Sequence, residues 1–318
     1  MTPLEPRNES IEISIIIPAF NEEQFIDQTL KSLKETDFPE NKFEIIVVDN
    51  GSTDNTVSIA EPLADIVAHL PDGNVGAVRN HGARLASGNV LIFIDADCTV
   101  EKAWLTQAYQ LGTQQDGEIV YGGICKVRKD ANWIERLWLL DGEKRYQKDL
   151  TGACIVINKD IFEAVGKFNE QITSGEDTDL SQRLKASGKT VKVLPQFYVT
   201  HLGNADTAWK FIRRQSWHGE NYFHDIHNSL RDPTFLLCAL TIATIPASIA
   251  FYKTAYNELS YLIFVPLIMP IIFSIKRLIY SKYKPRSIET LLKIYCLDAL
   301  YVAGRCLGII KSILYRRI

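Results

Sequence analysis

The pattern of apolar and polar positions divides the 318-residue chain into three parts. In the first part, short apolar runs rich in β-branched residues alternate with stretches of helix length. The runs fall at residues 13–17, 43–48, 65–68 and 90–94. Continuous apolar runs of this length are typical of strands that are buried on both faces. The repeated strand–helix units therefore predict an α/β fold, a mostly parallel Rossmann-like sheet with helices on both faces.

Turn and capping residues mark the ends of these units. Asn21 is expected to cap a helix that continues to about Thr36, and Ser87-Gly88 is expected to end a helix that begins near Gly76. The middle of the chain is mixed. Strands are expected at residues 118–127 and 153–157, and helices at residues 132–147 and 176–186.

The last third of the chain is apolar and basic. Residues 233–252 and 259–275 carry no charge, and about 20 apolar residues are needed to span a bilayer. The segment from Lys276 onward holds ten Lys and Arg residues against two acidic ones. Because basic residues flank both ends of the apolar pair, we expect a transmembrane helical hairpin whose two ends are cytoplasmic. The alternative is a buried helical core.

Residues 291–318 have a different pattern, because their charged side chains gather on one side of a helical wheel. This pattern favours an amphipathic helix that lies in the membrane interface over a third span. The chain is thus expected to consist of an N-terminal extension (1–11), a catalytic domain (12–228) and a membrane-associated region (229–318).

Composition excludes several classes of protein. The chain is 46% hydrophobic and 23% charged, which is enough apolar residue to build a core, and its net charge of −3 argues against a basic nucleic-acid binder. None of the six cysteines forms a CxxC pair, which favours a reducing environment. Residues 1–12 lack an apolar signal core, so export of the first domain by that route is not expected.

Acidic residues follow the predicted strands of the first part. Asp49 ends one strand, and the DxD motif Asp95-Ala96-Asp97 ends another. The carboxyl ends of parallel strands share one edge of a sheet, so these side chains should converge on one crevice. Two carboxylates at i and i+2 can hold Mg²⁺ or Mn²⁺ beside a phosphate. The alternatives are an ordinary turn for the DxD motif and a loop-ordering role for Asp49.

Two further candidates lie later in the chain. Glu176-Asp177 begins a predicted helix, where a carboxylate either caps the helix or serves as a general base. His201 follows a strand, where it is either a metal ligand or a structural residue.

Four stretches together resemble the family-2 glycosyltransferases of the GT-A fold. They are SIIIPAFNEE (14–23), VVDNGSTDNT (47–56), NVGAVRNHGARLASGNVLIFIDADC (74–98) and SGEDTDLSQRLKASG (174–188). The resemblance covers roughly residues 12–220 and implies an inverting transfer from a nucleotide-diphosphate sugar. The segment 211–221 matches the QxxRW segment of processive members poorly, which argues against processive polymer synthesis.

The resemblance also implies roles for individual residues. The base is Asp177, and Asp97 ligates Mg²⁺ or Mn²⁺, with His201 as a further ligand. The nucleotide-sugar site is formed by Pro18, Phe20, Glu22, Asp49, Arg79, Asp95 and Ala96. The acceptor side is formed by Gly152, Glu176 and Trp217.

The resulting hypothesis is a metal-dependent enzyme of polysaccharide biosynthesis, attached to the cytoplasmic membrane with its catalytic domain on the cytoplasmic side. Its donor would be a UDP- or GDP-sugar, its acceptor a lipid-linked or membrane-proximal glycan, and nucleic acid is not an expected partner. A sugar nucleotidyltransferase is one alternative, although PAFNEE is acidic where such enzymes carry a basic, glycine-rich loop. A noncatalytic membrane scaffold is another, although the acidic motifs are intact.

Overall fold

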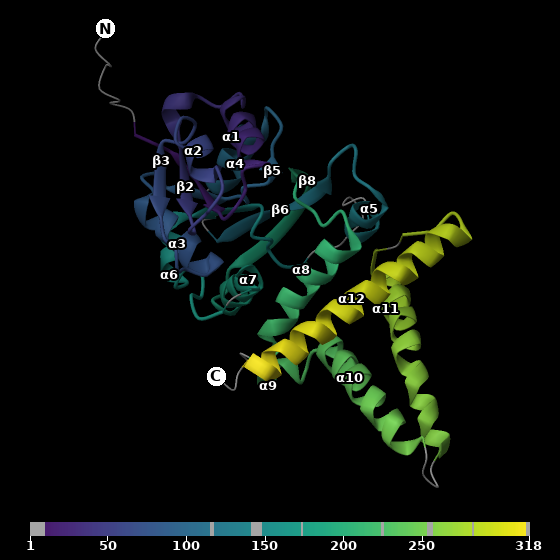
Figure 1. Ribbon diagram of the computed structural model, residues 1–318. Helices are drawn as coiled ribbons and strands as arrows, with labels where there is room; N and C mark the ends of the chain where they lie inside the picture. The colour runs from purple at the N-terminus through teal and green to yellow at the C-terminus, as the bar shows by residue number, and fades with distance from the viewer. Residues whose placement is uncertain are drawn as a thin grey trace. The chain divides into compact units, whose positions relative to one another are not determined.

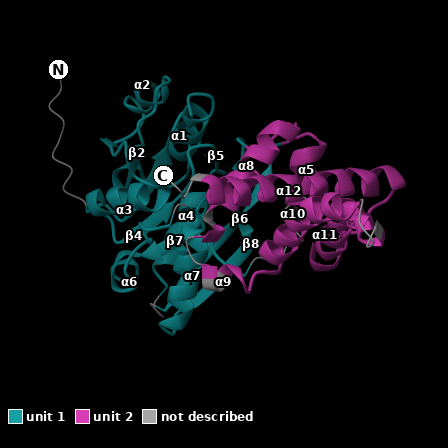
Figure 2. Cartoon of the chain, turned by 60° about the horizontal axis from the view of Figure 1, so that its bottom comes forward, with its two compact units in different colours: residues 1–128, 147–203 teal, residues 129–146, 204–318 magenta. Residues whose placement is uncertain are grey.

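The computed structural model describes residues 10–114, 118–140, 148–172, 174–223, 226–252, 257–281 and 283–315. The chain divides into two compact units: unit 1 comprises residues 1–128 and 147–203, and unit 2 comprises residues 129–146 and 204–318 (Figure 2). Unit 1 contains the sheet, and the elements described in unit 2 are all helical (Figure 1). The functional division predicted at residues 11/12 and 228/229 does not coincide with this division and stays a prediction.

Unit 1 is built on one eight-stranded sheet with the strand order β3-β2-β1-β4-β7-β6-β8-β5. The strands are β1 (Ile13–Ala19), β2 (Phe43–Asp49), β3 (Ile66–His69), β4 (Val90–Phe93), β5 (Cys98–Thr99), β6 (Ile119–Val127), β7 (Ile155–Asn158) and β8 (Thr190–His201). Strands β3, β2, β1 and β4 run parallel, as expected from the sequence. Beyond β4 the sheet is mixed, because β7 is antiparallel to both β4 and β6 while β6 and β8 are parallel.

Helices cover both faces of this sheet. The helices of unit 1 are α1 (Ile26–Lys34), η1 (Glu40–Lys42), α2 (Thr56–Ala60), α3 (Val75–Leu85), α4 (Trp104–Gly112), α6 (Lys159–Ala164) and α7 (Glu176–Ala186). Neighbouring residues of β1 point to opposite faces, so Ile15 and Ile17 pack in one core with α1 and α4, while Ile16 packs in another with α3, α6 and α7. This explains why the strand is apolar throughout and confirms the predicted fold class.

The predicted cap at Asn21 is wrong. Helix α1 begins at Ile26, five residues later, and its N-cap position is occupied by Phe25. Asn21 instead has a φ of +56°, and its side-chain oxygen accepts the backbone N–H of Thr53 at 2.8 Å. Asparagine tolerates the left-handed conformation, and here it joins the loop after β1 to the loop after β2.

Unit 2 consists of α5 (Trp133–Leu139), α8 (Ala208–Glu220), η2 (Asn221–Phe223), α9 (Ile226–Ser229), α10 (Pro233–Phe251), η3 (Asn257–Phe264), α11 (Val265–Ser281) and α12 (Ile288–Tyr315). Of the helix predicted at 132–147, residues 133–139 are helical and residues 141–147 lie outside the described residues. Asn132 caps α5 in a reciprocal capping box with Glu135.

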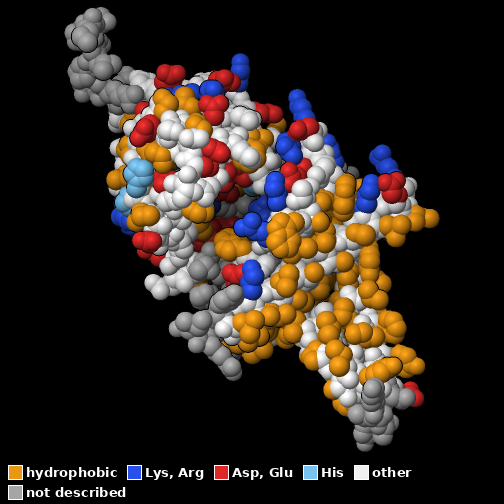
Figure 3. Space-filling model, viewed as in Figure 1, with side chains coloured by type: hydrophobic (Ala, Val, Ile, Leu, Met, Phe, Trp, Pro, Cys, Tyr) orange, Lys and Arg blue, Asp and Glu red, His pale blue; other side chains and the backbone are white. Residues whose placement is uncertain are grey.

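The two apolar segments predicted from sequence are helical. Among the described residues, Pro233–Phe251 and Glu258–Ser281 are long and apolar enough to cross a membrane. The second helix extends beyond the predicted 259–275. Most of their side chains are not buried, since 33% of the apolar window of the first segment and 17% of that of the second lie inside the protein (Figure 3). The exposure of these side chains argues against the alternative of a buried helical core.

Helix α12 contains most of the segment predicted to be amphipathic, and its polar side is occupied by contacts within unit 2. Asp298 is 1% exposed and accepts two hydrogen bonds from Arg277 of α11, with Nη2 at 2.6 Å and Nε at 3.0 Å from Oδ1. Ser274 donates to its other oxygen. The apolar side of α12 is exposed at several positions, among them Leu292 and Leu314. Residues 316–318 lie outside the described part of the chain.

Candidate active site

The DxD motif lies in the turn that follows β4. The carbonyl oxygen of Ala96 accepts the hydroxyl hydrogen of Thr29, from α1, at 2.8 Å. Ala96 is therefore held inside the protein, with 3% of its surface exposed. Asp95 and Asp97 flank it and belong to the carboxyl end of the parallel strands, where ligands of such sheets bind.

Asp97 and His201 are brought together by strand pairing. Strand β5 runs antiparallel to β8, with Cys98 opposite His201, although the two positions are far apart in the sequence. Asp97 Oδ2 lies 3.3 Å from His201 Nδ1, and both side chains are about nine-tenths buried. The backbone of Asp97 also accepts the N–H of Leu202 at 2.8 Å. The structure thus places two of the predicted metal ligands side by side.

The donor atoms at this position fit a hard divalent cation. Ligand atoms of Asp97, Cys98 and His201 lie within 4.8 Å of one another. Burial raises the pKa of the Cys98 thiol well above its usual range, and the charge of Asp97 raises it further. Cys98 is therefore a neutral thiol that donates to Asp97 Oδ1, at 3.6 Å. A carboxylate oxygen and an imidazole nitrogen remain, which suits Mg²⁺ or Mn²⁺.

Glu22 contributes a further carboxyl group near the DxD motif. It follows β1, and its backbone N–H donates to Thr56 Oγ1 at 2.7 Å. Burial raises the pKa of Glu22 to about 8, and part of the rise comes from the negative charges of Asp97 and Asp95. Such crowding of carboxyl groups indicates a site that a cation would stabilise.

Arg79 is almost completely buried. Its side chain is 3% exposed and pairs with two acids, Asp95 Oδ1 at 2.7 Å from Nη2 and Glu176 Oε1 at 2.5 Å from Nη1. Burial alone would lower the pKa of Arg79, but the charges of Asp95 and Glu176 outweigh it and raise the pKa. Arg79 is thus a buried cation that joins the DxD turn to the start of α7.

The predicted base, Asp177, stands in the first turn of α7 and is partly exposed. Its Oδ2 accepts the backbone N–H of Gly152 at 3.0 Å, and its Oδ1 accepts the N–H of Thr178 at 2.7 Å. These two bonds fix the orientation of the carboxylate. Glu176, the preceding residue, is buried and faces Arg79. The two adjacent acids therefore have different surroundings.

The residues predicted for the nucleoside pocket lie at the ends of β1 and β2. Pro18 pairs with Val48, and Ala19 pairs with Asp49 in the parallel ladder. Asp49 is 4% exposed and accepts the backbone N–H groups of Gly51 and Ser52, the contacts expected of a loop-ordering residue. Phe20 is 55% exposed beside this loop end of the sheet. Their nucleotide contacts stay a prediction.

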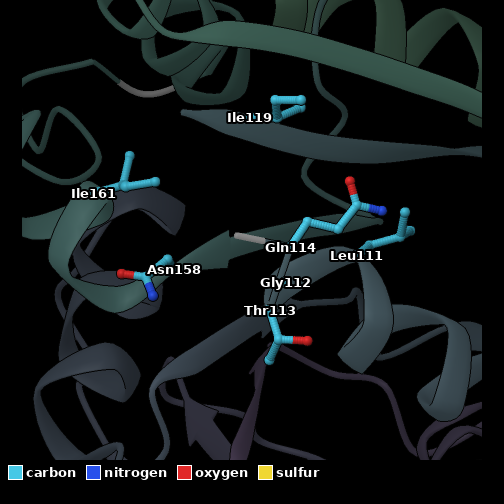
Figure 4. A pocket seen from close by; sticks show the side chains of 7 residues that line it. All are labelled: Leu111, Gly112, Thr113, Gln114, Ile119, Asn158 and Ile161. Atoms are coloured by element: carbon cyan, nitrogen blue, oxygen red, sulfur yellow. The ribbon is translucent and has the colours of Figure 1, made fainter. Parts of the chain in front are cut away.

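One residue predicted for the acceptor side belongs to unit 2, and one cavity lies elsewhere in unit 1. Trp217 lies on α8 in unit 2 with 43% of its surface exposed, so its acceptor role stays a prediction. A cavity of about 110 Å³ lies between α4, β6 and α6 and is lined by Gln114, Ile119 and Asn158, among others (Figure 4). Asn158 pairs with Val90, the first residue of β4, so this cavity lies at the opposite end of the sheet from the DxD motif.

The sequence did not indicate the contacts of two groups that shape the site, Cys98 and Arg79. Cys98 was counted with the cysteines, yet its thiol supports Asp97. Arg79 was predicted to form part of the nucleotide-sugar site, which stays a prediction, and the structure adds that both its Nη groups pair with acids. The signal for Cys98 was its position directly after the motif; the partners of Arg79 become visible only when α3, β4 and α7 are placed together.

The fold of the chain is the GT-A fold of glycosyltransferases. The chain is similar in fold to the mannosyltransferase PcManGT from Pyrobaculum calidifontis, solved with GDP-Man and Mn²⁺, with a TM-score of 0.59, 17% identity, and coverage of 98% of this chain and 89% of that one. It is also similar to residues 1–349 of TarS from S. aureus, solved with UDP-GlcNAc, with a TM-score of 0.50, 17% identity and 93% coverage of each chain.

Sequence comparison agrees with the fold. Residues 14–165 match the sequence model of Glycosyl transferase family 2. The glycosyltransferase AglE of Haloferax volcanii is 29% identical over 191 residues, which cover 55% of this chain and 62% of AglE, less than two thirds of that relative. The resemblance to glycosyltransferase family 2 seen in the sequence is thus confirmed over residues 14–165, just under half of the chain.

Proposed function

We propose that the chain is an inverting, metal-dependent glycosyltransferase that moves a sugar from a nucleotide-diphosphate sugar to a hydroxyl group of a lipid-linked or membrane-proximal acceptor. The observation that carries this proposal is the cluster of acidic side chains at the carboxyl end of the strands in unit 1. It joins the Asp97–His201 pair to Asp95, and through Arg79 to the helix that bears Asp177. A glycosyl transfer needs two functions close together. One is a site that binds the anionic leaving group, and the other is a base for the acceptor hydroxyl.

The base role fits the position of Asp177. A general base must reach the proton of the acceptor hydroxyl, and Asp177 is partly exposed and held by Gly152 and Thr178. Asp177 would take the hydroxyl proton as the acceptor oxygen bonds to the anomeric carbon. The bond from that carbon to the diphosphate oxygen would break at the same time, with its electron pair leaving on the diphosphate. One displacement from the opposite face inverts the configuration.

Asp97 and His201 would hold the divalent cation, with Asp95 beside them. The cation, when bound, supplies positive charge that stabilises the leaving diphosphate. The complex of the fold relative PcManGT with GDP-Man and Mn²⁺ supports this assignment, and the TarS complex with UDP-GlcNAc supports a nucleotide-sugar donor.

The membrane part of the proposal rests on unit 2. Two helices there have the length and composition of membrane spans, and many of their apolar side chains are exposed. Basic residues on both sides of this hairpin favour cytoplasmic ends. A catalytic domain on that side would have access to nucleotide sugars and to acceptors at the membrane surface.

The experiment uses the full chain purified in detergent. UDP- and GDP-sugars are screened for Mn²⁺-dependent hydrolysis and for thermal stabilisation, since a ligand that binds the folded state stabilises it. Asp97→Ala should abolish both effects. Asp177→Asn should abolish turnover but retain Mn²⁺-dependent nucleotide binding.

Asp179→Asn is the matched control, because Asp179 lies on the same helix and pairs with Arg183. Its turnover should stay close to that of the unchanged chain. Full activity of the Asp97 and Asp177 variants would refute the assignment. Pyrophosphate release from a nucleoside triphosphate and a sugar phosphate would favour the nucleotidyltransferase alternative. Absence of nucleotide binding with or without Mn²⁺ would favour the noncatalytic scaffold.

A further inference from the structure

A single guanidinium group connects two parts of the active site that come from distant segments. Arg79 projects from α3; one of its Nη atoms binds Asp95, after β4, and the other binds Glu176, at the first turn of α7. With 3% of its side chain exposed, it has little surface left for a substrate. Its geometry is that of a link between two protein segments.

The surroundings of Arg79 restrict its movement. The guanidinium lies over the ring of Phe168, 5.6 Å from the ring centroid. On another side is Gly152, where an added Cβ would come within 2.8 Å of Cζ. Only a residue without a side chain leaves room for the guanidinium at this distance. The same Gly152 donates its backbone N–H to Asp177. Arg79, Gly152 and the start of α7 are therefore packed as one assembly.

Charge gives a reason for this assembly. Glu176 is buried, and burial raises its pKa, whereas the neighbouring Arg79 lowers it. Without the guanidinium, three carboxyl groups, Asp95, Glu176 and Asp177, would lie close together with no cation between them. Their mutual repulsion would push the start of α7 away from the DxD turn.

We propose that Arg79 is a positioning residue, whose guanidinium locks the DxD turn to the first turn of α7 and so fixes Asp177 relative to the donor carboxylates. The inference rests on the proposed function, in which Asp177 is the base. It changes the role predicted from the sequence, because Arg79 acts on the reaction through Asp95 and Glu176 and does not touch the nucleotide.

The role requires the shape of the guanidinium as well as its charge. A lysine keeps the charge, but its single ammonium group cannot present two separate donors in a fixed plane. Arg79→Lys should therefore loosen the link. A shift of about 1 Å in a reacting group lowers turnover by up to about 100-fold. We expect kcat to fall by about 30- to 100-fold while the KM for the donor changes less than about threefold.

Substitutions at Glu176 provide a second test if the Arg79 variant folds poorly. Glu176→Gln keeps an oxygen that accepts the Arg79 hydrogen bond, whereas Glu176→Ala removes it. Positioning predicts that the Gln variant loses clearly less of kcat than the Ala variant, which loses about as much as Arg79→Lys. In the double variant Arg79→Lys/Glu176→Ala the two losses should not multiply, because both remove the same link. Arg84→Lys, on the same helix but half exposed, is the control that should retain kcat.

The experiment measures kcat and donor KM for these variants together with amide hydrogen exchange of α7. Faster exchange at the first turn of α7 in Arg79→Lys than in Arg84→Lys is expected, and this readout does not depend on turnover. A tenfold rise in donor KM with unchanged kcat would overturn the inference and make Arg79 a donor contact. The inference would also be overturned if Glu176→Gln and Glu176→Ala lost equal amounts of kcat. The same holds if the kcat losses of Arg79→Lys and Glu176→Ala multiplied in the double variant. If the unchanged chain turns over no nucleotide sugar, the proposed function fails. Separately, unaltered amide hydrogen exchange of α7 in Arg79→Lys would refute the link between the DxD turn and α7.

Discussion

Replacing Gly203 by alanine should disable the candidate metal site without removing any of its ligands. Gly203 follows His201 by two residues and packs directly against Asp97. A Cβ added there would lie 3.1 Å from Asp97 Cγ and 3.2 Å from its Cβ, and closer still to Oδ2. The backbone carbonyl of Asp97 is bonded to Leu202, so its main chain is not free to withdraw. The carboxylate itself must rotate or shift away from His201.

The size of the effect follows from this contact. A carbon atom and a carboxylate oxygen approach to about 3.3 Å, so Oδ2 must move by about 1 Å. A misplacement of this size costs about 100-fold in turnover. At 1.36 kcal/mol for each factor of ten, this equals about 2.7 kcal/mol of transition-state stabilisation. Mn²⁺ affinity should fall as well, because Asp97 and His201 would no longer present their atoms together.

The assay is Mn²⁺ titration by calorimetry and donor turnover, each at matched folded fraction. Gly188→Ala is the control, because Gly188 ends α7 with a φ of +83° and has no atom within 4 Å of an added Cβ. Its left-handed backbone should cost about 1 to 2 kcal/mol of stability while kcat is retained. If Gly203→Ala binds Mn²⁺ and turns over donor like the unchanged chain, the reasoning about Asp97 is refuted.

Three further predictions concern other parts of the chain. Asp298→Ala should destabilise unit 2 by about 3–5 kcal/mol in detergent, because it leaves the partly buried Arg277 cation without its acidic partner. The double change Arg277→Met/Asp298→Leu should recover most of this loss. Equal melting temperatures for the two variants would contradict the prediction. Burial raises the pKa of Glu22 from 4.5 to about 8, so between these pH values the carboxyl group is mainly protonated. Mn²⁺ bound at the neighbouring Asp97 would favour the ionised carboxylate, and the proton would be released. Mn²⁺ affinity should therefore rise by up to about tenfold per pH unit until about pH 8. Calorimetry in two buffers would detect the released proton. If the pH dependence of Mn²⁺ affinity is the same in Glu22→Gln, Glu22 is not the titrating group. Cys98→Ala removes a hydrogen bond to Asp97 and should weaken Mn²⁺ binding about two- to tenfold. Cys98→Ser should restore the affinity, because a hydroxyl group can also donate to Asp97. An unchanged affinity in the Ala variant would show that the thiol does not support Asp97.

The strands of the first half were predictable because both faces of the sheet are buried. β2 and β4 are apolar at every position up to their ends apart from Glu44 and Asp49, and the predicted ranges 43–48 and 90–94 differ from the observed ones by one residue. The cap at Asn21 was not predictable in the same way. An asparagine can either cap a helix or occupy a left-handed turn, and the choice is made here by Thr53 in the loop after β2.

The candidate chemistry was predictable as a set of residues but not as an arrangement. The DxD motif and the Glu176-Asp177 pair follow from their positions after a strand and at the start of a helix. The different surroundings of Glu176 and Asp177 do not, because they depend on Arg79 and Gly152, which lie on other elements. Adjacent residues on a helix point in directions about 100° apart, so one acid can be buried while the next stays partly exposed.

By itself the sequence determined the class of fold, the alternating strands and helices of residues 13–94, the acidic motifs and the two apolar segments near the end of the chain. Hydrophobic period, turn residues and helix length are local properties, which is why these features could be predicted. The tertiary structure alone decided that His201 lies beside Asp97, that Gly203 leaves room for this pair, and that Arg79 joins Asp95 to Glu176. These contacts depend on the pairing of β5 with β8 and on the packing of α3 between distant segments, and such long-range geometry is set by the register of strands and the shape of the core.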